Sequence, residues 1–192
     1  DAALLQLALL REARTEGLTV RDATPFNIQW RGVMPCFIDI PSFGVLRPNE
    51  PWAAYGQFCR TFLYPLMLQS YKGASFHPIL RGSLEGIEPD WMRNIMGFRD
   101  LFRSGIFADV VMLSWFERKY GTQKVDARSK LDSAGFSSEL VTRNIERLEK
   151  VVSKLRWKEA GYSMQGYFDA LPSYSAGEFE QKKAFVSKVV SS

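Results

Sequence analysis

The sequence predicts a mainly helical α+β fold with one short β-hairpin. Three features lead to this prediction: an Ala- and Leu-rich start, a β-branched and aromatic stretch over 28–40, and a later segment whose apolar residues recur at steps of 4, 3, 4 and 3. Helices repeat every 3.6 residues and strands every 2, so the patterns can be told apart. With 192 residues and 46% apolar content, the chain can bury a sizeable core.

The first half of the chain contains a helix, the hairpin and a second helix, in that order. Residues 2–14 place leucines at helical spacing, and Gly17 follows as a stop signal, so a mostly buried helix is expected. Residues 28–40 predict the hairpin. Residues 52–71 are again helical in pattern, with their aromatic residues on one core-facing side, and Pro65 is expected to kink or split this helix.

The second half of the chain predicts further helices. Residues 73–105 are rich in Gly and read as short helices and loops, whereas 106–120 read as a buried helix. A long helix begins at Ser137 or Ser138 and ends near Arg156. Its apolar positions are Val141, Ile145, Leu148, Val152 and Leu155. A last helix begins at Ser175, where Ser175 and Glu178 form a capping box.

The net charge is +4, and residues 118–158 carry eleven Lys or Arg against five Asp or Glu. On the long helix, one basic stripe consists of Arg143, Arg147, Lys150 and Lys154. The stripe is either a contact for an acidic partner or a solvated face that nearby glutamates partly neutralise. No aromatic residues alternate with these charges, so nucleic acid is not an expected partner.

The longest apolar stretches fall short of the about 20 residues that cross a bilayer, so no membrane span is expected. Cys36 and Cys59 predict a pair of buried free thiols in a reducing compartment, which favours a cytoplasmic location. The single histidine excludes the usual Cys/His zinc sites. The chain begins with Asp1 and not with Met, which indicates a piece of a longer protein.

The hairpin brings together the candidate functional residues. If its turn is centred on Val33, Ile28 faces Ile38 and Asn27 faces Asp39 across the two strands. Asn27 and Asp39 lie on one face, and the face expected to be buried carries Ile28, Trp30, Cys36, Ile38 and Ile40. Directly opposed Cβ atoms lie about 4.5 to 5.5 Å apart, so an amide oxygen and a carboxylate can share one Mg²⁺ ion. Asp22 lies in the loop before the hairpin, where a second carboxylate near the metal suits a general base.

The same residues carry a resemblance to a known family. Asp22-Ala-Thr-Pro25-Phe-Asn27 resembles the D-x-x-P-x-N core of the catalytic loop of protein kinases and of aminoglycoside-type phosphotransferases. Asp39-Ile-Pro follows the hairpin, where those families carry their second metal-binding Asp. The resemblance implies the large lobe of a kinase-like fold, in which Asp22 orients an acceptor hydroxyl while Asn27 and Asp39 hold Mg²⁺ on the phosphates of ATP.

The sequence also departs from that family. Val20 stands in place of the family's His before the catalytic Asp, Thr24 in place of its loop Lys, and Ile40-Pro41 in place of the Phe-Gly after its metal-binding Asp. No glycine-rich phosphate loop and no strand Lys can be found, since both would precede Asp1. We therefore expect this chain alone not to phosphorylate a substrate.

A second resemblance covers nearly the whole chain. The stretches GLTVRDATPFNIQWRGVMPCFIDIPSF, EPWAAYGQFCRTFLYPLML and YFDALPSYSAGEFEQKKAFVSKVV resemble the amino-terminal half of a group of bacterial class I SAM-dependent methyltransferases. In that group the segment that matches Tyr174 to Lys182 leads into the SAM-binding domain. The resemblance implies a kinase-like region over 1–121 and a helical linker over 122–192, with SAM bound only in a further domain beyond Ser192.

Three functions remain open at this stage. The chain is part of a methyltransferase-like transferase whose kinase-like region binds Mg²⁺-nucleotide or substrate through Asp22, Asn27 and Asp39. Alternatively, it belongs to a phosphotransferase that acts on a hydroxyl of a small molecule or glycan. In the third case the lobe has lost catalysis and is a scaffold.

Overall fold

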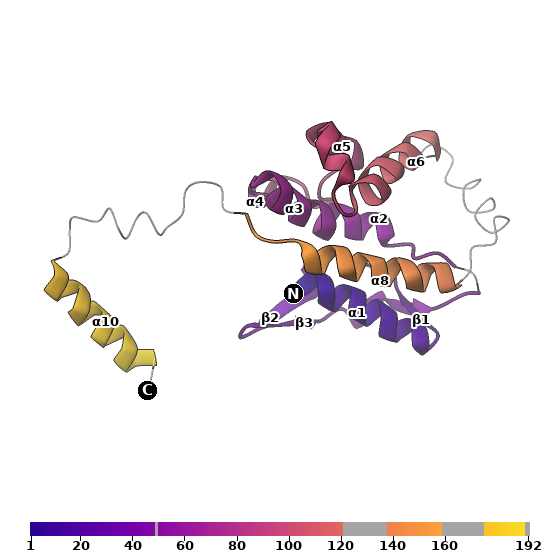
Figure 1. The fold of residues 1–192 in the computed structure, drawn as a ribbon. Helices are drawn as coiled ribbons and strands as arrows, with labels where there is room; N and C mark the ends of the chain where they lie inside the picture. The colour runs from indigo at the N-terminus through magenta and orange to yellow at the C-terminus, as the bar shows by residue number, and fades with distance from the viewer. Residues whose placement is uncertain (49, 121–137, 159–174, 191–192) are drawn as a thin grey trace. The chain divides into compact units, whose positions relative to one another are not determined.

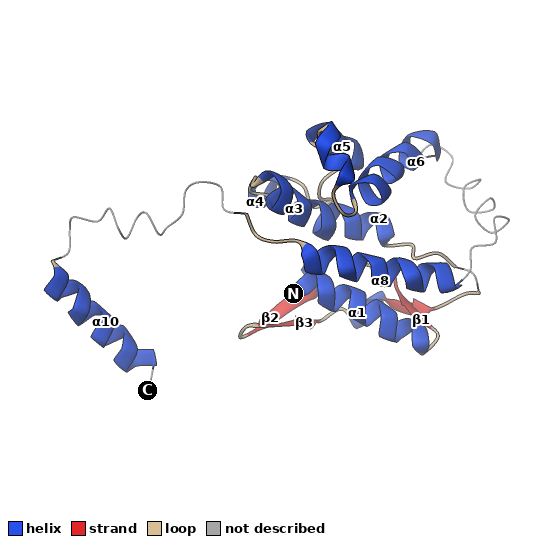
Figure 2. Cartoon of the chain, viewed as in Figure 1, coloured by secondary structure: helices blue, strands red, loops and turns tan. Residues whose placement is uncertain are grey.

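The computed structural model of the protein describes residues 1–48, 50–120, 138–158 and 175–190 (Figure 1). Two compact units divide the chain, Asp1–Lys158 and Glu159–Ser192. Among the described residues, helices predominate in both units and the strands belong to the first (Figure 2). The helices of the first unit are α1 (Ala2–Thr15), α2 (Tyr55–Phe58), α3 (Tyr64–Met67), α4 (His77–Gly82), α5 (Pro89–Ile95), α6 (Leu113–Tyr120) and α8 (Ser138–Lys154).

Short segments of other geometry connect or extend these helices. The π-helical ones are η3 (Cys59–Leu63), η4 (Leu68–Lys72) and η6 (Ile106–Met112), and the 3₁₀ turns are η1 (Pro25–Asn27), η2 (Ile40–Ser42) and η5 (Phe98–Phe102). Two antiparallel pairs are formed by β1 (Leu18–Val20) with β4 (Phe43–Val45) and by β2 (Ile28–Arg31) with β3 (Met34–Phe37). The α+β prediction is confirmed, and the strand pair β1–β4 is an element that the sequence did not predict.

The two long helices of the first unit, α1 and α8, pack side by side (Figure 1). The apolar residues that both helices bury belong to one core, and Arg11 of α1 pairs with Glu149 of α8 at 3.0 Å. Both helices were predicted within two residues of these bounds. The helix α8 belongs to the same compact unit as α1, and this unit ends at Lys158.

The helical run from Tyr55 to Lys72 forms the centre of the core. Phe58 and Leu63 are fully buried in it, and Trp52 packs on Phe58 with ring centroids 5.5 Å apart. The run does not end at Pro65, because the wider turn of η3 precedes the residue that lacks an N–H. The expected core-facing aromatic cluster is confirmed.

The segment over 106–120 is only half buried. Ile106 and Val110 are fully buried on its inner side, but Phe107 and Trp115 are 59% and 46% exposed on its outer side. The expectation of a buried helix is therefore correct for one face alone. The expected short helices over 73–105 are present as α4, α5 and η5.

The hairpin has a different register from the predicted one. Gly32 and Val33 form a two-residue tip, so Arg31 pairs with Met34 and Ile28 pairs with Phe37. Gly32 has φ +63°, a conformation that glycine adopts at little cost. The predicted pairing of Ile28 with Ile38 is wrong by one residue, and a slip of one residue exchanges the two faces of a strand.

The slip in register explains which side chains of the second arm of the hairpin are exposed. Ile38 and Ile40 were expected to be buried and are 53% and 71% exposed. Trp30 was also expected to be buried; it shares the face of the buried Ile28 but lies nearer the tip and is 56% exposed. Cys36 is also exposed, so only Cys59 fulfils the expectation of a buried free thiol. Phe37 instead turns toward the core, where its ring meets that of Phe43 at 5.6 Å.

The second unit contains α10 (Ala176–Val190). The expected capping box is confirmed: the backbone N–H of Ser175 donates to Glu178 Oε2 at 2.8 Å, and the N–H of Glu178 donates to Ser175 Oγ at 3.4 Å. Within the described ranges, no helix combines the length and the apolar character that a membrane span requires.

Candidate functional site

The candidate site lies where the chain leaves and re-enters the strand pair β1–β4. Val20 at the end of β1 pairs with Phe43 at the start of β4. Directly beyond this pair, the N–H of Arg21 donates to the carbonyl oxygen of Ser42 at 2.8 Å. The two ends of segment 21–42 therefore meet, and the candidate residues Asp22, Asn27 and Asp39 all lie within this segment.

Asn27 and Asp39 converge on the hydroxyl of Ser42. The amide Nδ2 of Asn27 donates to Ser42 Oγ at 3.4 Å, and Ser42 Oγ donates to Asp39 Oδ2 in a short hydrogen bond. Ser42 is 6% exposed, whereas the two side chains that it links are half-buried. The amide and the carboxylate that the sequence analysis paired are therefore neighbours, held by a buried hydroxyl.

The geometry of this meeting is not the predicted one. Asn27 and Asp39 are not opposed across the ladder, because the carbonyl oxygen of Asn27 accepts from the N–H of Ile38 at 2.9 Å. Asp39 lies beyond the end of β3 and precedes the 3₁₀ turn η2. Sequence reasoning missed Ser42, although its position three residues after Asp39 is the spacing at which one helical turn brings side chains together.

The loop that carries Asp22 is fixed to the core. Asp22 Oδ1 accepts from the N–H of Thr24 at 3.1 Å, which closes an Asx turn. Ala23 is fully buried, and its N–H donates to Gln57 Oε1 at 2.7 Å while its carbonyl oxygen accepts from Thr61 Oγ1 at 3.2 Å. The central helical run thus holds the residue beside Asp22 from both sides.

Asp22 is half-buried and makes no hydrogen bond to Asn27 or Asp39 within the part of the chain that the structure describes. Asp22 follows Arg21, whose backbone N–H is hydrogen-bonded to the carbonyl oxygen of Ser42. A carboxylate near a cation but not on it fits the general-base position that the sequence predicts for Asp22.

Two oxygen-bearing side chains, those of Asn27 and Asp39, lie at Ser42. Mg²⁺ is usually bound by one or two carboxylates together with substrate phosphates. Asp39 supplies a carboxylate, and Asn27 has its amide oxygen left when Nδ2 bonds to Ser42. Over the described ranges there is no group of three or more His, Cys, Asp or Glu side chains that could hold a metal.

The basic stripe of α8 is not a uniform cationic surface. Arg147 turns inward and pairs with Asp109, Nη1 to Oδ2 at 2.7 Å. Asp109 is fully buried and also accepts from the hydroxyl of Tyr55 at 2.6 Å. The hydrogen bond to Asp109 raises the pKa of Arg147, and burial raises the pKa of Tyr55.

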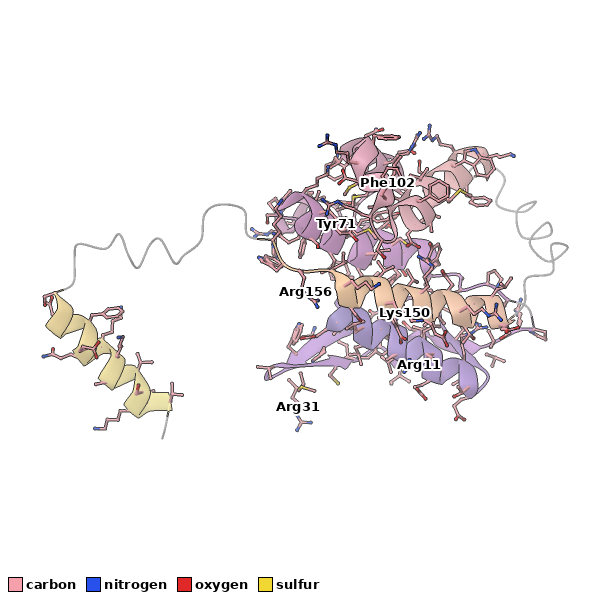
Figure 3. The ribbon with its side chains drawn as sticks, in the orientation of Figure 1. Arg11, Arg31, Tyr71, Phe102, Lys150 and Arg156 are labelled. Carbon is pink, nitrogen blue, oxygen red and sulfur yellow. The ribbon has the colours of Figure 1, made fainter. Side chains whose placement is uncertain are left out.

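Arg147 is therefore unavailable to an acidic partner, and this correction leaves three residues of the stripe. Arg143 pairs with Glu139 at 2.6 Å within the helix. Lys150 and Lys154 are exposed, and Figure 3 shows Lys150 on the outer side of α8. The exposed part of the stripe therefore consists of Arg143, Lys150 and Lys154.

One cavity adjoins the candidate site. It has a volume of about 240 Å³ and is lined in part by Pro25 and Phe26, between Asp22 and Asn27 in the chain, and by Thr61. A larger cavity of about 620 Å³ lies along α5, η6 and α6 and is lined by none of the candidate residues.

Comparison with known proteins gives one match. The nodulation protein NoeA of Rhizobium meliloti (strain 1021) is 32% identical over 126 residues, which are 65% of this chain and 26% of that protein. The matched part thus spans about a quarter of the relative's length. No family model and no solved structure matches the chain.

Proposed function

We propose that the chain is part of a bacterial SAM-dependent methyltransferase-like transferase, and that its first unit is a kinase-like region that binds a Mg²⁺-nucleotide through Asn27 and Asp39. The observation that carries the proposal is the convergence of these two side chains on the buried hydroxyl of Ser42. In the proposed site, Asp22 orients the hydroxyl of an acceptor. SAM would bind only in a further domain.

The placement of the residues along the chain supports the kinase-like part. The resemblance implies an Asp, an Asn and a second Asp that act together. Asp22, Asn27 and Asp39 all lie in segment 21–42, whose two ends meet beyond the strand pair β1–β4. The anchoring of Ala23 by Gln57 and Thr61 supplies the rigid support that a positioned general base needs.

The methyltransferase-like part of the proposal rests on the stretches quoted above, including Tyr174 to Lys182. The similarity to a nodulation protein of a bacterium agrees with a bacterial origin. A phosphotransferase that acts on a small-molecule or glycan hydroxyl is the second candidate, and the cavity beside Pro25 and Phe26 favours it.

Paramagnetic Mn²⁺ tests the metal site directly. Titrating Mn²⁺ with ATP into the ¹⁵N-labelled chain should broaden the amide signals of Asn27 and Asp39 before those of α1. The Asp39→Asn variant should lose this effect, and Glu12→Gln, which changes an exposed carboxylate of α1, should keep it. If the signals near Ser42 do not broaden, or if Asp39→Asn behaves as the wild type, nucleotide binding is refuted and the scaffold alternative is favoured.

A further inference from the structure

The cavity of about 240 Å³ beside the Asp22 loop has walls from three parts of the chain. We call Pro25, Phe26 and Thr61 the floor of this cavity. The other lining residues come from α4 and the turn after it, and they are His77, Leu80, Arg81, Ser83 and Leu84. The cavity is thus enclosed by the loop that follows Asp22, by the central helical run and by α4 with the turn after it.

The floor of this cavity is fixed to the candidate site. Thr61 contributes to the lining, and its Oγ1 also donates to the carbonyl oxygen of Ala23. Ala23 is the residue next to Asp22, so one side chain connects the cavity with the loop of the proposed general base. A ligand in the cavity would therefore contact Thr61, which also holds the residue next to Asp22.

The turn after α4 is held equally firmly. The π-helical geometry of η3 frees the carbonyl oxygen of Arg60, which accepts from the N–H of Ile87 at 3.0 Å. Gly86 has φ +81°, and a Cβ atom there would lie 2.4 Å from that oxygen. Because only glycine allows this approach, the wall that carries Ser83 and Leu84 has a defined position.

The lining determines the chemistry of a matching ligand. The proline ring, the phenyl ring and the two leucines offer carbon surface, and Phe26 and Leu84 are exposed, as are Arg81 and His77. None of the lining residues is Asp or Glu. An apolar group that carries a negative charge is the complementary ligand, and a cationic ligand is disfavoured.

We propose that this cavity holds the apolar part of an anionic, hydroxyl-bearing small molecule, which is the acceptor in the phosphotransfer of the second candidate function. This inference rests on that second candidate and on the nucleotide site of the proposed function. The hydroxyl oxygen of the acceptor attacks the terminal phosphorus of a nucleoside triphosphate, and its proton passes to Asp22. The bond to the bridging oxygen breaks, so the products are a phosphorylated acceptor and a nucleoside diphosphate.

Three probes of equal shape and different charge test the cavity: 3-phenylpropionate, 3-phenylpropan-1-ol and 3-phenylpropylamine. Titrated into the ¹⁵N-labelled chain, the acid should shift the amide signals of Phe26, Thr61 and Leu84, with weaker binding of the alcohol and weakest binding of the amine. Arg81→Glu should weaken the acid about fivefold, as an exposed charge contact of roughly 1 kcal/mol implies. Arg99→Glu, an exposed arginine outside the cavity, should leave the order unchanged.

A second variant keeps the test independent of charge. Leu84 is 71% exposed, so Leu84→Trp should preserve the fold while it obstructs the cavity and weakens all three probes. Equal binding of the three probes by the wild type, or undiminished binding by Leu84→Trp, overturns the assignment of the ligand.

Paramagnetic Mn²⁺ tests whether the cavity and the metal site are close to each other. With Mn²⁺ and ATP present, the protons of bound 3-phenylpropionate should relax faster, and Asp39→Asn should abolish this effect without changing the affinity for the acid. Binding of the acid without faster relaxation overturns the acceptor role. If Mn²⁺ broadens the signals near Ser42 but no probe shifts the cavity signals, this inference fails while the proposed function stands.

Discussion

The guanidinium of Arg147 on α8 forms a two-pronged ion pair with the fully buried carboxylate of Asp109 in η6. The carboxylate also accepts from Tyr55, and the hydroxyl of Tyr64 donates to the backbone oxygen of Asp109. The buried carboxylate of Asp109 thus joins η6 to α8 and to the central helical run. Such a charge is tolerated only while its partners remain in place.

Replacement of Arg147 should therefore destabilise the first unit strongly. Arg147→Ala leaves Asp109 buried without its counter-charge, and we expect a loss of about 3 kcal/mol in the free energy of unfolding, measured by urea denaturation. Arg143→Ala, which removes an exposed pair with Glu139, should cost less than about 1 kcal/mol. Similar losses for the two variants would mean that the buried pair is not essential.

Ser42 should control the affinity of the candidate site for a metal ion. Ser42→Ala removes the hydroxyl shared by Asn27 and Asp39, so we expect about 10-fold weaker Mn²⁺ binding in the presence of ATP. The free energy of unfolding should fall by only about 1 kcal/mol. The control is Ser153→Ala on α8, whose hydroxyl bonds only within its own helix. Unchanged Mn²⁺ affinity in Ser42→Ala would contradict the role assigned to this hydroxyl.

Asp100 should make the free energy of unfolding of the first unit depend on pH, with a loss of stability at acid pH. Burial by itself raises the pKa of Asp100, but the hydrogen bonds from Lys72 and the N–H of Gly97, together with the charges of Lys72 and Arg103, outweigh it and lower the pKa below its usual value. The stabilisation is complete above the pKa of the unfolded chain, about 3.9, and is lost as the pH falls through the lower folded pKa.

The test is a series of urea midpoints between neutral pH and about pH 2, a range set by the unfolded pKa of Asp. Asp100→Asn should be less stable than the wild type at neutral pH, and the difference should shrink on acidification. Asp90→Asn is the matched control, because Asp90 pairs with Arg118 in a half-exposed contact. A difference between Asp100→Asn and the wild type that stays constant with pH would exclude the linkage.

The two cysteines should react at very different rates. Cys36 is exposed on the hairpin, whereas Cys59 is fully buried and burial raises the pKa of its thiol. A chromogenic disulfide reagent should label Cys36 quickly in the native protein and Cys59 only after denaturant is added. Cys36→Ser should abolish the fast phase, and a fast phase that persists in this variant would place Cys59 at the surface.

Local patterns determined how much of the fold was predictable. α1, α8 and the cap of α10 follow from residues within one or two helical turns of each other, and their prediction is confirmed. The hairpin was also predicted, but its register depended on whether the turn contains Gly32 and Val33 or is centred on Val33. A difference of one residue was enough to exchange the exposed and buried faces.

The candidate site was predicted only in part, because its contacts depend on tertiary structure and not on local patterns. Asn27 and Asp39 meet although the predicted ladder was wrong, because the bend of the chain after β3 brings Asp39 back to Ser42. Arg147 was correctly placed on one stripe of α8, but its partner Asp109 lies 38 residues away in sequence. Helical periodicity describes which residues share a face, whereas only tertiary packing decides which of them receives a buried partner.

The closing of segment 21–42 by β1–β4 has a consequence for variation in length. The hairpin tip, near Arg31 in Figure 3, points away from the strand pair β1–β4, which closes the segment that contains Asp22, Asn27 and Asp39. Residue pairs added between Arg31 and Met34 would lengthen this arm without displacing its base. The hairpin can therefore become longer, and its tip can make new contacts, without a change in the residues near Ser42.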